Sequence, residues 1–540
     1  MAQKSNVQSL KSKVQRWRYG ARLQPAKAHE SRVAWKIDDA TCCRLVPPAS
    51  AVSLQLKKSL FEDVLADMKK TKQHADESGP QTVTDFIKID NGQKAIKIGF
   101  TDQKISPHAG LSTFVSFLHW HGLKSKLEKA VPARTSHNGP PAIDVVLSFV
   151  IGILAGAKKL AQVAHLQADP VLPSLLGIKR VAGASALSRY FKKFTSAYQN
   201  SLCFSPLWQW CLERLPSLPG GYTLDLDTTR LLHEDAHGKE GVRTGHTPKG
   251  CKRCYNPLLG MIAEAKLVVG FWLRPGNTRC DNNAVGFTLE LLERLPRYIR
   301  IGLVRADAGF FEEKWLQLLE KLHLPYIVVG RVHEPLRQLI RRSTRWQKTE
   351  LAGTEIAEEL FQGWGWGCLR RVVLIRHSRR ERPEAGGKPL LHCPGYCFQV
   401  LVTSLPASVP GLEVWRRYNG RAGSENIIKE LDACFALPQI CLEEFYATEA
   451  AMSLAILTYN LSVLFQRHLG WSQRVSAATL RFRLFTTGGI ISRSGGYITI
   501  RLAVRAGPLR EWWRQLLEKI ICPFRNCIAV NFRSPTCGHS

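Results

Sequence analysis

Apolar residues recur at every third or fourth position from residue 142 to about 215, a period typical of amphipathic helices. Gly183 and other breaks divide this stretch, so several short helices are expected. One is predicted at Ala186–Phe194, with Ser185 as its N-cap. From residue 219 short apolar runs alternate with helical segments, and this alternation predicts a mixed α/β sheet.

The predicted strands are short runs rich in apolar and β-branched residues: Tyr222–Leu226, Leu258–Met261, Leu267–Leu273, Tyr298–Arg305 and Tyr326–Gly330. A helix is expected at Glu312–Leu322, before the last of these strands. Further strands are expected at Arg371–Ile375 and Phe398–Thr403, separated by a polar segment with proline and glycine. These two strands indicate a β-rich insertion, after which helices resume and continue to His468.

The length of 540 residues exceeds what one hydrophobic core usually supports, so two to four domains are expected. The pattern gives six segments: a basic N-terminal region at 1–131, a helical region at 142–218, the first part of an α/β core at 219–331, the β-rich insertion at 332–410, the second part of the core at 411–470 and a C-terminal region at 471–540.

Lysine and arginine number 75 against 44 acidic residues, giving a formal net charge of +31. Such a charge favours binding to polyanions, with nucleic acid as the first candidate and an anionic membrane surface as the alternative. The apolar runs at Val145–Ala157 and Ala451–Phe465 are shorter than a membrane span or contain the polar Asn460. They are interpreted as buried core helices, and no membrane association is expected.

Fifteen cysteines, with no secretory signal pattern, indicate reduced thiols and a cytoplasmic protein. Cys251 and Cys254 form a CxxC pair, and Cys393 and Cys397 form a second pair with unusual spacing. Together they are candidate zinc ligands, but free thiols explain them better because the spacing departs from that of structural zinc sites.

Three basic side chains, Arg189, Lys192 and Lys193, belong to the helix predicted at Ala186–Phe194. Short helices separated by a turn, with a basic second helix, are consistent with a helix-turn-helix that reads DNA. The alternative is an ordinary packing helix with a solvated basic face, which the sequence favours because the motif is weakly specified.

A second basic stretch, at His246–Arg253, contains Lys249, Lys252 and Arg253 and follows closely after the strand at Tyr222–Leu226. These side chains are candidates for contact with a phosphate backbone. A solvated loop is an equal alternative, since exposed lysines are common on any protein surface.

Two aspartates stand at the ends of predicted strands: Asp227 in Leu-Asp-Leu-Asp-Thr-Thr, and Asp307 in Val-Arg-Ala-Asp-Ala-Gly-Phe. Strand ends project side chains into the crevice where α/β sheets usually bind ligands. Paired carboxylates there are suited to a hard divalent ion such as Mg²⁺. Each aspartate alone is better explained as a turn residue or helix cap.

Glu425 is a third candidate acid. Spacing along one predicted helix places Tyr418, Arg421, Glu425 and Lys429 on one stripe. An acid flanked by cations is suited to a metal ligand with phosphate-binding neighbours. The alternative is a salt-bridged surface helix, in which such pairs are common.

In this order, Asp227-Thr-Thr, Arg-Ala-Asp307-Ala-Gly-Phe and Tyr418-x2-Arg421-x3-Glu425 resemble the three signatures of DDE transposases of bacterial insertion sequences. Other segments resemble the insertion-sequence thirteen-eighty group: His108-Ala-Gly-Leu111, Tyr255-Asn-Pro-Leu-Leu259, Trp272-Leu-Arg-Pro-Gly-Asn277 and Thr458-Tyr-Asn-Leu461. The resemblance covers roughly residues 80 to 510. It implies an RNase H-like mixed sheet with a β-rich insertion, plus a helical N-terminal DNA-binding region.

The resemblance also implies that Asp227, Asp307 and Glu425 are catalytic and hold two Mg²⁺ ions, which Mn²⁺ can replace. Tyr418 and Arg421 would contact DNA near the cut. The family's lysine usually lies seven residues after the glutamate, where this chain has Asp432, so the role of Lys429, one turn after Glu425, is in doubt.

The implied protein is a transposase of the bacterial cytoplasm, associated with the nucleoid. It would act as a homodimer on double-stranded DNA, binding the terminal inverted repeats of its element, cutting as an endonuclease and joining the ends to target DNA. Two alternatives remain: an RNase H-like nuclease that does not join ends, and a catalytically inactive DNA-binding protein.

Overall fold

The structure, a computed structural model, describes residues 87–90, 95–133, 139–247, 250–363, 365–494 and 497–521. The chain divides into two compact units, one of residues 23–103 and one of residues 1–22 with 104–540. In the smaller unit, β1 (Ile87–Asp90) pairs with β2 (Ala95–Ile98) in an antiparallel hairpin. Most of the predicted basic N-terminal region, residues 1–86, lies outside the described residues.

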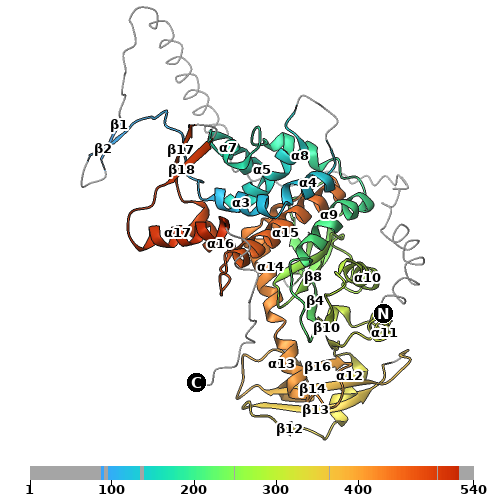
Figure 1. Cartoon of the computed structure of the whole chain (residues 1–540). Coiled ribbons are helices and arrows are strands. Elements are labelled where there is room, and N and C mark those ends of the chain that lie inside the picture. Colours follow the sequence, from blue (N-terminus) through green and yellow to red (C-terminus); the bar gives the residue numbers. More distant parts are fainter. Residues whose placement is uncertain are drawn as a thin grey trace, which may run out of the picture. The chain divides into compact units, whose positions relative to one another are not determined.

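A mixed sheet forms the centre of the larger unit (Figure 1). Its core strands are β4 (Tyr222–Thr228), β8 (Leu258–Ile262), β9 (Leu267–Trp272), β10 (Ile301–Ala306) and β11 (Tyr326–Val329). Their order across the sheet is β9-β8-β4-β10-β11. β4, β10 and β11 are parallel, whereas β8 runs antiparallel to β4 and to β9. The five strands predicted before the insertion are confirmed, and their arrangement is consistent with an RNase H-like core.

The segment predicted as an insertion is β-rich, and its strands extend the core sheet instead of forming a separate one. Its elements are α12 (Glu334–Arg342), β12 (Gln347–Lys348), β13 (Thr354–Phe361), β14 (Arg370–Ser378), β15 (Lys388–Leu390) and β16 (Cys393–Thr403). The long strand β16 makes the connection, because its last residues pair with β11 on one side and with β14 on the other. The candidate site and the insertion therefore share one continuous hydrogen-bonded sheet.

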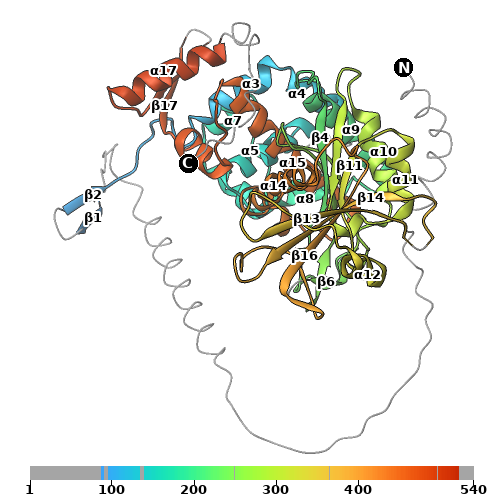
Figure 2. The same cartoon turned by 90° about the horizontal axis from the view of Figure 1, so that it is seen from below.

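Helices cover both faces of the core sheet. α10 (Ala284–Arg294) and α11 (Glu313–Lys321) lie on one face, where Leu291 packs against glycines of β8 and β9. α14 (Ala422–Cys434) lies on the other, as the two views together show (Figure 2). The α11 range agrees with the helix expected at Glu312–Leu322.

The remaining described elements lie around this sheet. The helical ones are α3 (Leu111–Trp120), α4 (Leu123–Ala130), α5 (Ala142–Ala155), α6 (Leu160–Ala164), η1 (His165–Ala168), α7 (Leu172–Leu176), α8 (Ala184–Phe191), α9 (Ala197–Leu212), η2 (Ala308–Phe310), α13 (Gly411–Asn419), η3 (Leu437–Gln439), α15 (Phe445–His468), α16 (Ala477–Leu480), η4 (Arg481–Phe485) and α17 (Pro508–Ile521). The short strands are β3 (Ile105–Ser106), β5 (Leu231–Leu232), β6 (Arg243–Thr247), β7 (Gly250–Tyr255), β17 (Gly489–Ser494) and β18 (Tyr497–Leu502).

The helix α15 is the one described helix long and apolar enough to cross a membrane, and its most apolar window is entirely buried in the protein. It packs against β9, α9 and α5. The interpretation of Ala451–Phe465 as a buried core helix is thus confirmed. The second apolar run corresponds to α5, whose residues Ile143–Leu154 are also buried.

Asn460 of α15 closes the edge of the sheet at β9. Its side-chain oxygen accepts a hydrogen bond from the Val268 amide at 2.9 Å, and its amide group donates to the Val268 carbonyl at 2.6 Å. A neighbouring strand would normally supply both bonds. This explains why a polar residue interrupts the apolar run that the sequence shows there.

Replacing Asn460 with alanine should lower the free energy of unfolding by about 3 kcal/mol, because both backbone groups of Val268 lose their buried partner. Urea denaturation measures this change. The matched control is Ser462→Ala, since the Ser462 hydroxyl is equally buried but donates only to the Tyr459 carbonyl of its own helix. Equal stability losses in the two variants would show that Asn460 does not close the sheet edge.

Candidate active site

The parallel pairing of β4 and β10 brings two acids together. Leu226 lies opposite Ala306 in the register of the two strands, so Asp227 and Asp307 follow side by side. Asp307 leaves its strand in extended conformation and caps η2, where its Oδ1 accepts a hydrogen bond from the Gly309 amide at 2.9 Å. The prediction that these two acids stand at neighbouring strand ends is confirmed by this geometry.

Asp227 is 7% exposed and is held by two polar contacts. Its Oδ1 accepts from the Thr228 amide at 2.8 Å, and its Oδ2 lies 2.7 Å from Nη2 of Arg421. Burial raises the pKa of Asp227 to about 6; the Arg421 charge opposes this shift and the Asp307 charge adds to it. The carboxyl group is therefore costly to ionise and is stabilised chiefly by Arg421.

The helix predicted to carry Tyr418, Arg421, Glu425 and Lys429 on one stripe is divided in the structure. α13 ends at Asn419 and α14 begins at Ala422. Across the junction, backbone amides donate hydrogen bonds to the carbonyls three residues earlier. Glycine has a low helix propensity, and Gly420 lies where the chain closely approaches Arg305. The prediction of one continuous helix was therefore wrong; Tyr418 lies at the end of α13, and Glu425 and Lys429 lie in α14.

Arg421, expected to contact DNA near the cut, is 7% exposed and forms an ion pair with Asp227 at the end of β4. Besides its ion pair with Asp227, its guanidinium lies 3.4 Å from the Leu226 carbonyl. Burial lowers its pKa, but Asp227, Tyr418, Asp307 and Asp225 together outweigh this effect and raise the pKa. Tyr418 lies beside it, and burial raises the pKa of its hydroxyl, with Asp307 and Asp227 adding to the shift. Tyr418 and Arg421 thus belong to the same site as the two aspartates.

Glu425 lies in the first turn of α14, one turn after Arg421, and its side chain is exposed. No hydrogen bond or ion pair joins it to Asp227 or Asp307 in the described structure. Within the described residues, no three or more histidine, cysteine or acidic side chains are grouped closely enough to hold a metal ion. The structure therefore brings two of the three predicted acids together and places the third on the adjoining helix.

A profile of the family described as "Transposase DDE domain group 1" matches residues 89–522, most of the chain. The chain belongs to the DDE transposases. It is also similar to a solved structure, a cryo-EM synaptic complex of piggyBac transposase with hairpin DNA. That similarity has 13% sequence identity and a TM-score of 0.40, and covers 82% of this chain and 90% of that chain. No curated protein sequence matches the chain.

The transposase folds its second basic stretch into a β-hairpin of β6 and β7, where the sequence left a solvated loop as an alternative. The Lys252 ammonium lies 2.8 Å from a Glu234 carboxylate oxygen, and Arg253 donates to the Ala236 carbonyl at 2.9 Å. Lys249 lies outside the described residues. The Lys252 and Arg253 side chains therefore already have polar partners within the protein.

The basic helix α8 begins earlier than predicted, at Ala184, because Gly183 adopts an extended conformation at the N-cap. Ser185 consequently lies inside the helix and is not its cap. Lys192 and Lys193 follow the helix, where Lys192 pairs with Glu443 and Glu444 at 2.7 and 3.0 Å.

Lys193 donates to the Ala133 carbonyl at 2.8 Å, and Arg189 donates to the Ser185 carbonyl within its own helix at 3.3 Å. The three basic residues are exposed or partly exposed, and each also contacts the protein itself. These contacts fit a packing role and still leave positive charge at the surface.

The cysteines considered as zinc ligands are free thiols in different surroundings. Cys251 and Cys254 share β7, but Cys251 is exposed whereas Cys254 is buried. Cys393 and Cys397 belong to β16 in the insertion. Neither pair takes part in a metal-binding group among the described residues.

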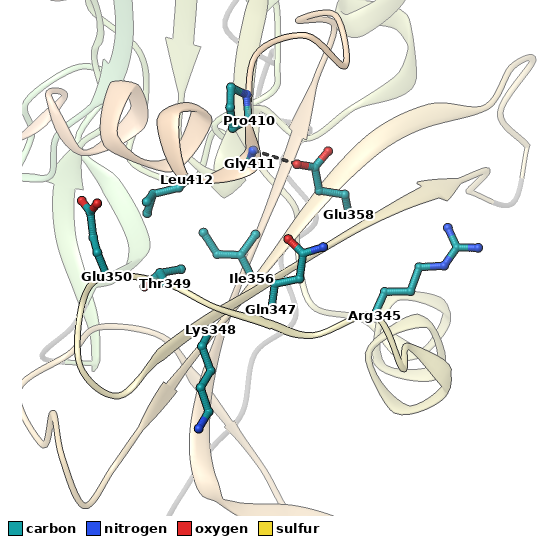
Figure 3. A pocket seen from close by; sticks show the side chains of 10 residues that line it. All are labelled: Arg345, Gln347, Lys348, Thr349, Glu350, Ile356, Glu358, Pro410, Gly411 and Leu412. Atoms are coloured by element: carbon teal, nitrogen blue, oxygen red, sulfur yellow. Dashed lines mark hydrogen bonds between the residues drawn. The ribbon is translucent and has the colours of Figure 1, made fainter.

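A cavity of about 500 Å³ lies in the insertion, at the start of α13 (Figure 3). Its lining residues are Arg345, Gln347, Lys348, Thr349, Glu350, Ile356, Glu358, Pro410, Gly411 and Leu412. Glu358 already accepts a hydrogen bond from the Gly411 amide at 2.7 Å, so the positive end of α13 is neutralised there. None of the predicted site residues lines this cavity, and the candidate active site rests on the strand-end acids instead.

The sequence predicted no site role for Asp225, Arg305 or Ser424. Asp225 is fully buried and bonded to both Arg305 and Ser424. The sequence did contain a sign of this ion pair. Asp225 and Arg305 lie two residues before Asp227 and Asp307, so in paired parallel strands Asp225 and Arg305 fall on the same side of the sheet. Opposite charges at those positions indicate a buried ion pair.

The raised pKa of Asp227 predicts a pH-dependent stability. Because protonation of Asp227 favours the folded state, its contribution to the free energy of unfolding is fully present below about pH 4. That contribution is lost as the pH rises through 6. Relative to Asp227→Asn, which cannot ionise, the wild type should lose on the order of 3 kcal/mol of unfolding free energy over that range. Urea denaturation of both proteins from pH 3.5 to 8 measures most of the change. A pH-independent difference between the two proteins would contradict the raised pKa.

Proposed function

We propose that this transposase cuts DNA at the ends of its own insertion sequence and joins those ends to a target, as a member of the insertion-sequence thirteen-eighty group. The observation that carries the proposal is the pairing of Asp227 and Asp307 at parallel strand ends, with the junction of α13 and α14 over them. Tyr418, Arg421 and Glu425 all lie at that junction. This is the set of residues that the signatures of the family single out.

The oxygen donors of the site fit a hard divalent cation. Asp227 and Asp307 provide carboxylates from rigid strand ends, and their mutual repulsion is a charge arrangement that a cation relieves. Glu425, exposed on α14, would complete the set. We propose two Mg²⁺ ions, with Mn²⁺ as a substitute. When bound, such ions activate the attacking oxygen and stabilise the leaving oxygen of a phosphodiester.

The residues of the chain then have separate tasks. Asp227 and Asp307 hold negative charge at fixed positions, and Arg421 balances that charge beside Asp227. In cutting, a water oxygen attacks the phosphorus and the bond to the 3′ oxygen breaks, so that this oxygen leaves and takes up a proton. In joining, the freed 3′-hydroxyl oxygen attacks a target phosphorus and loses its proton, while the bond from that phosphorus to the target 3′ oxygen breaks and this oxygen leaves and takes up a proton. Tyr418 and Arg421 would contact the phosphate that lies between these oxygens.

The proposed partner is double-stranded DNA, both the terminal inverted repeats and the target, bound by a homodimer in the bacterial cytoplasm and nucleoid. The net charge of +31 supports such a polyanionic partner. Lys429 is exposed on α14, one turn beyond Glu425, and could reach the backbone next to the cut. Arg189, Lys192, Lys193, Lys249, Lys252 and Arg253 would add charge farther away.

Each of the changes Asp227→Asn, Asp307→Asn and Glu425→Gln should abolish both cutting and joining while leaving DNA binding intact, because each removes a charge and keeps the side-chain size. The assay uses purified protein, the DNA flanking its gene and Mg²⁺, with cut and joined ends mapped by sequencing. Glu518→Gln is the control, since Glu518 is also an exposed helical glutamate. Normal cutting by any of the three variants would contradict the three-carboxylate mechanism.

The same assay separates the two alternative functions. A wild-type protein that cuts without joining would be an RNase H-like nuclease. One that binds the ends without cutting would be an inactive DNA-binding protein.

DNA affinity should fall steeply as salt rises, because neutralising phosphates releases counterions. A loss of about a thousandfold between 50 and 200 mM NaCl is expected if roughly six phosphates are contacted. Fluorescence anisotropy with a labelled end duplex measures this slope. Affinity that does not change with salt would exclude a basic DNA-binding surface.

A further inference from the structure

A buried polar cluster lies beneath the junction of α13 and α14. Arg305 of β10 pairs with Asp225 of β4 through two bonds, Nε to Oδ1 at 2.6 Å and Nη2 to Oδ2 at 2.8 Å. The hydroxyl of Ser424 in α14 donates to the same Asp225 carboxylate at 2.5 Å. Arg305 also donates from Nη1 to the carbonyl of Arg417, at 2.5 Å, near the end of α13. One carboxylate and one guanidinium thus connect two strands with two helices.

Each member of the cluster is a sequence neighbour of one proposed site residue. Asp225 and Arg305 precede Asp227 and Asp307 by two residues, and Ser424 directly precedes Glu425. The Arg417 carbonyl directly precedes Tyr418. Because neighbouring residues share the same backbone, the position of the cluster determines where the proposed site residues are held.

The junction is shaped to fit the cluster closely. A Cβ atom at Gly420 would lie 2.6 Å from Nη1 of Arg305, closer than two such atoms can approach. The backbone of Gly420 has a φ of −55°, which any residue adopts, so glycine is needed there for space and not for conformation. By contrast, nothing lies within 4 Å of a Cβ placed at Gly423.

Stability alone is a weak explanation for such a cluster. Desolvating a carboxylate and a guanidinium costs much of what their attraction returns, and apolar side chains often serve as well in a core. Asp225 is fully buried and the Arg305 side chain is 6% exposed, so the desolvation cost applies in full. Apolar side chains form no directional bonds. Here the Ser424–Asp225 bond orients α14 and the bond from Arg305 to the Arg417 carbonyl orients α13 relative to the strands.

We propose that Asp225, Arg305 and Ser424 are positioning residues that hold the α13–α14 junction, and with it Glu425 and Tyr418, in register with Asp227 and Asp307. The inference rests on the proposed metal-dependent function. Groups that orient metal ligands from outside the site typically change metal affinity or activity by about 10- to 100-fold. Mg²⁺ requires near-ideal octahedral geometry, so a displaced junction should impair Mg²⁺-dependent cutting most.

Two matched pairs of variants test the proposal: Gly420→Ala with Gly423→Ala, and Ser424→Ala with Ser462→Ala. Gly420→Ala and Ser424→Ala should each slow cutting of end DNA in Mg²⁺ by about 10- to 100-fold. The loss in Mn²⁺ should be smaller, because this larger ion tolerates distorted ligand geometry. Both should also speed hydrogen–deuterium exchange across residues 417–428. Gly423→Ala and Ser462→Ala should match the wild type in all three measurements.

Wild-type rates and exchange in Gly420→Ala and Ser424→Ala would overturn the positioning role while leaving the proposed function standing. Equal losses in Mg²⁺ and Mn²⁺ with a lowered melting temperature would overturn it as well, because they indicate general destabilisation. A wild type that does not cut its end DNA in either metal would overturn the proposed function and this inference together.

Discussion

Two carboxylates held side by side repel each other, and the structure around the candidate site is arranged to contain that repulsion. The parallel pairing of β4 with β10 imposes it, because the register places Asp307 next to Asp227. The protein offsets it with Arg421, which sits at the helix junction and pairs with Asp227. Even so, burial and Asp307 keep the pKa of Asp227 raised to about 6. A site with excess negative charge at fixed positions is one that a divalent cation would stabilise.

The same two strands carry a second pair of charges, of opposite sign, two residues earlier. Asp225 and Arg305 attract each other where Asp227 and Asp307 repel, and the attractive pair is the more deeply buried. The attraction between Asp225 and Arg305 thus holds the two strands together, whereas Asp227 and Asp307 leave negative charge at the strand ends. Ser424 and the Arg417 carbonyl extend the attractive pair to the helices, which connects the position of α14 to the strand ends.

Much of the fold could be predicted from the sequence because the core strands are short, apolar and separated by clear turn signals. The strand ends could also be predicted, since Asp227 and Asp307 directly follow apolar runs. The continuation of the core sheet into the insertion could not be predicted, because it depends on β16 pairing with two strands at once. The residue pattern along a segment indicates a strand, but it does not indicate which other strands that strand pairs with.

The helix around Glu425 shows a second limit. Its spacing predicted one continuous helix, yet the structure divides it at Gly420 and Arg421, where Gly420 lies close to Arg305. That contact is between residues more than a hundred positions apart, whereas periodicity depends only on residues close together in the sequence. For the same reason the sequence did not predict that Arg421 pairs with Asp227. The strand-end positions of Asp227 and Asp307 could be predicted from the sequence, whereas the side chains that contact them could be found only in the fold.

The central claim is that Asp227, Asp307 and Glu425 together bind divalent metal. The most direct test is a crystal structure of the protein with end DNA and Mn²⁺, in which anomalous scattering locates the ions. We predict anomalous peaks within bonding distance of Asp227 and Asp307, with the Glu425 carboxylate turned toward them from α14. Peaks absent from the strand ends, with Asp227 still paired only to Arg421, would contradict it.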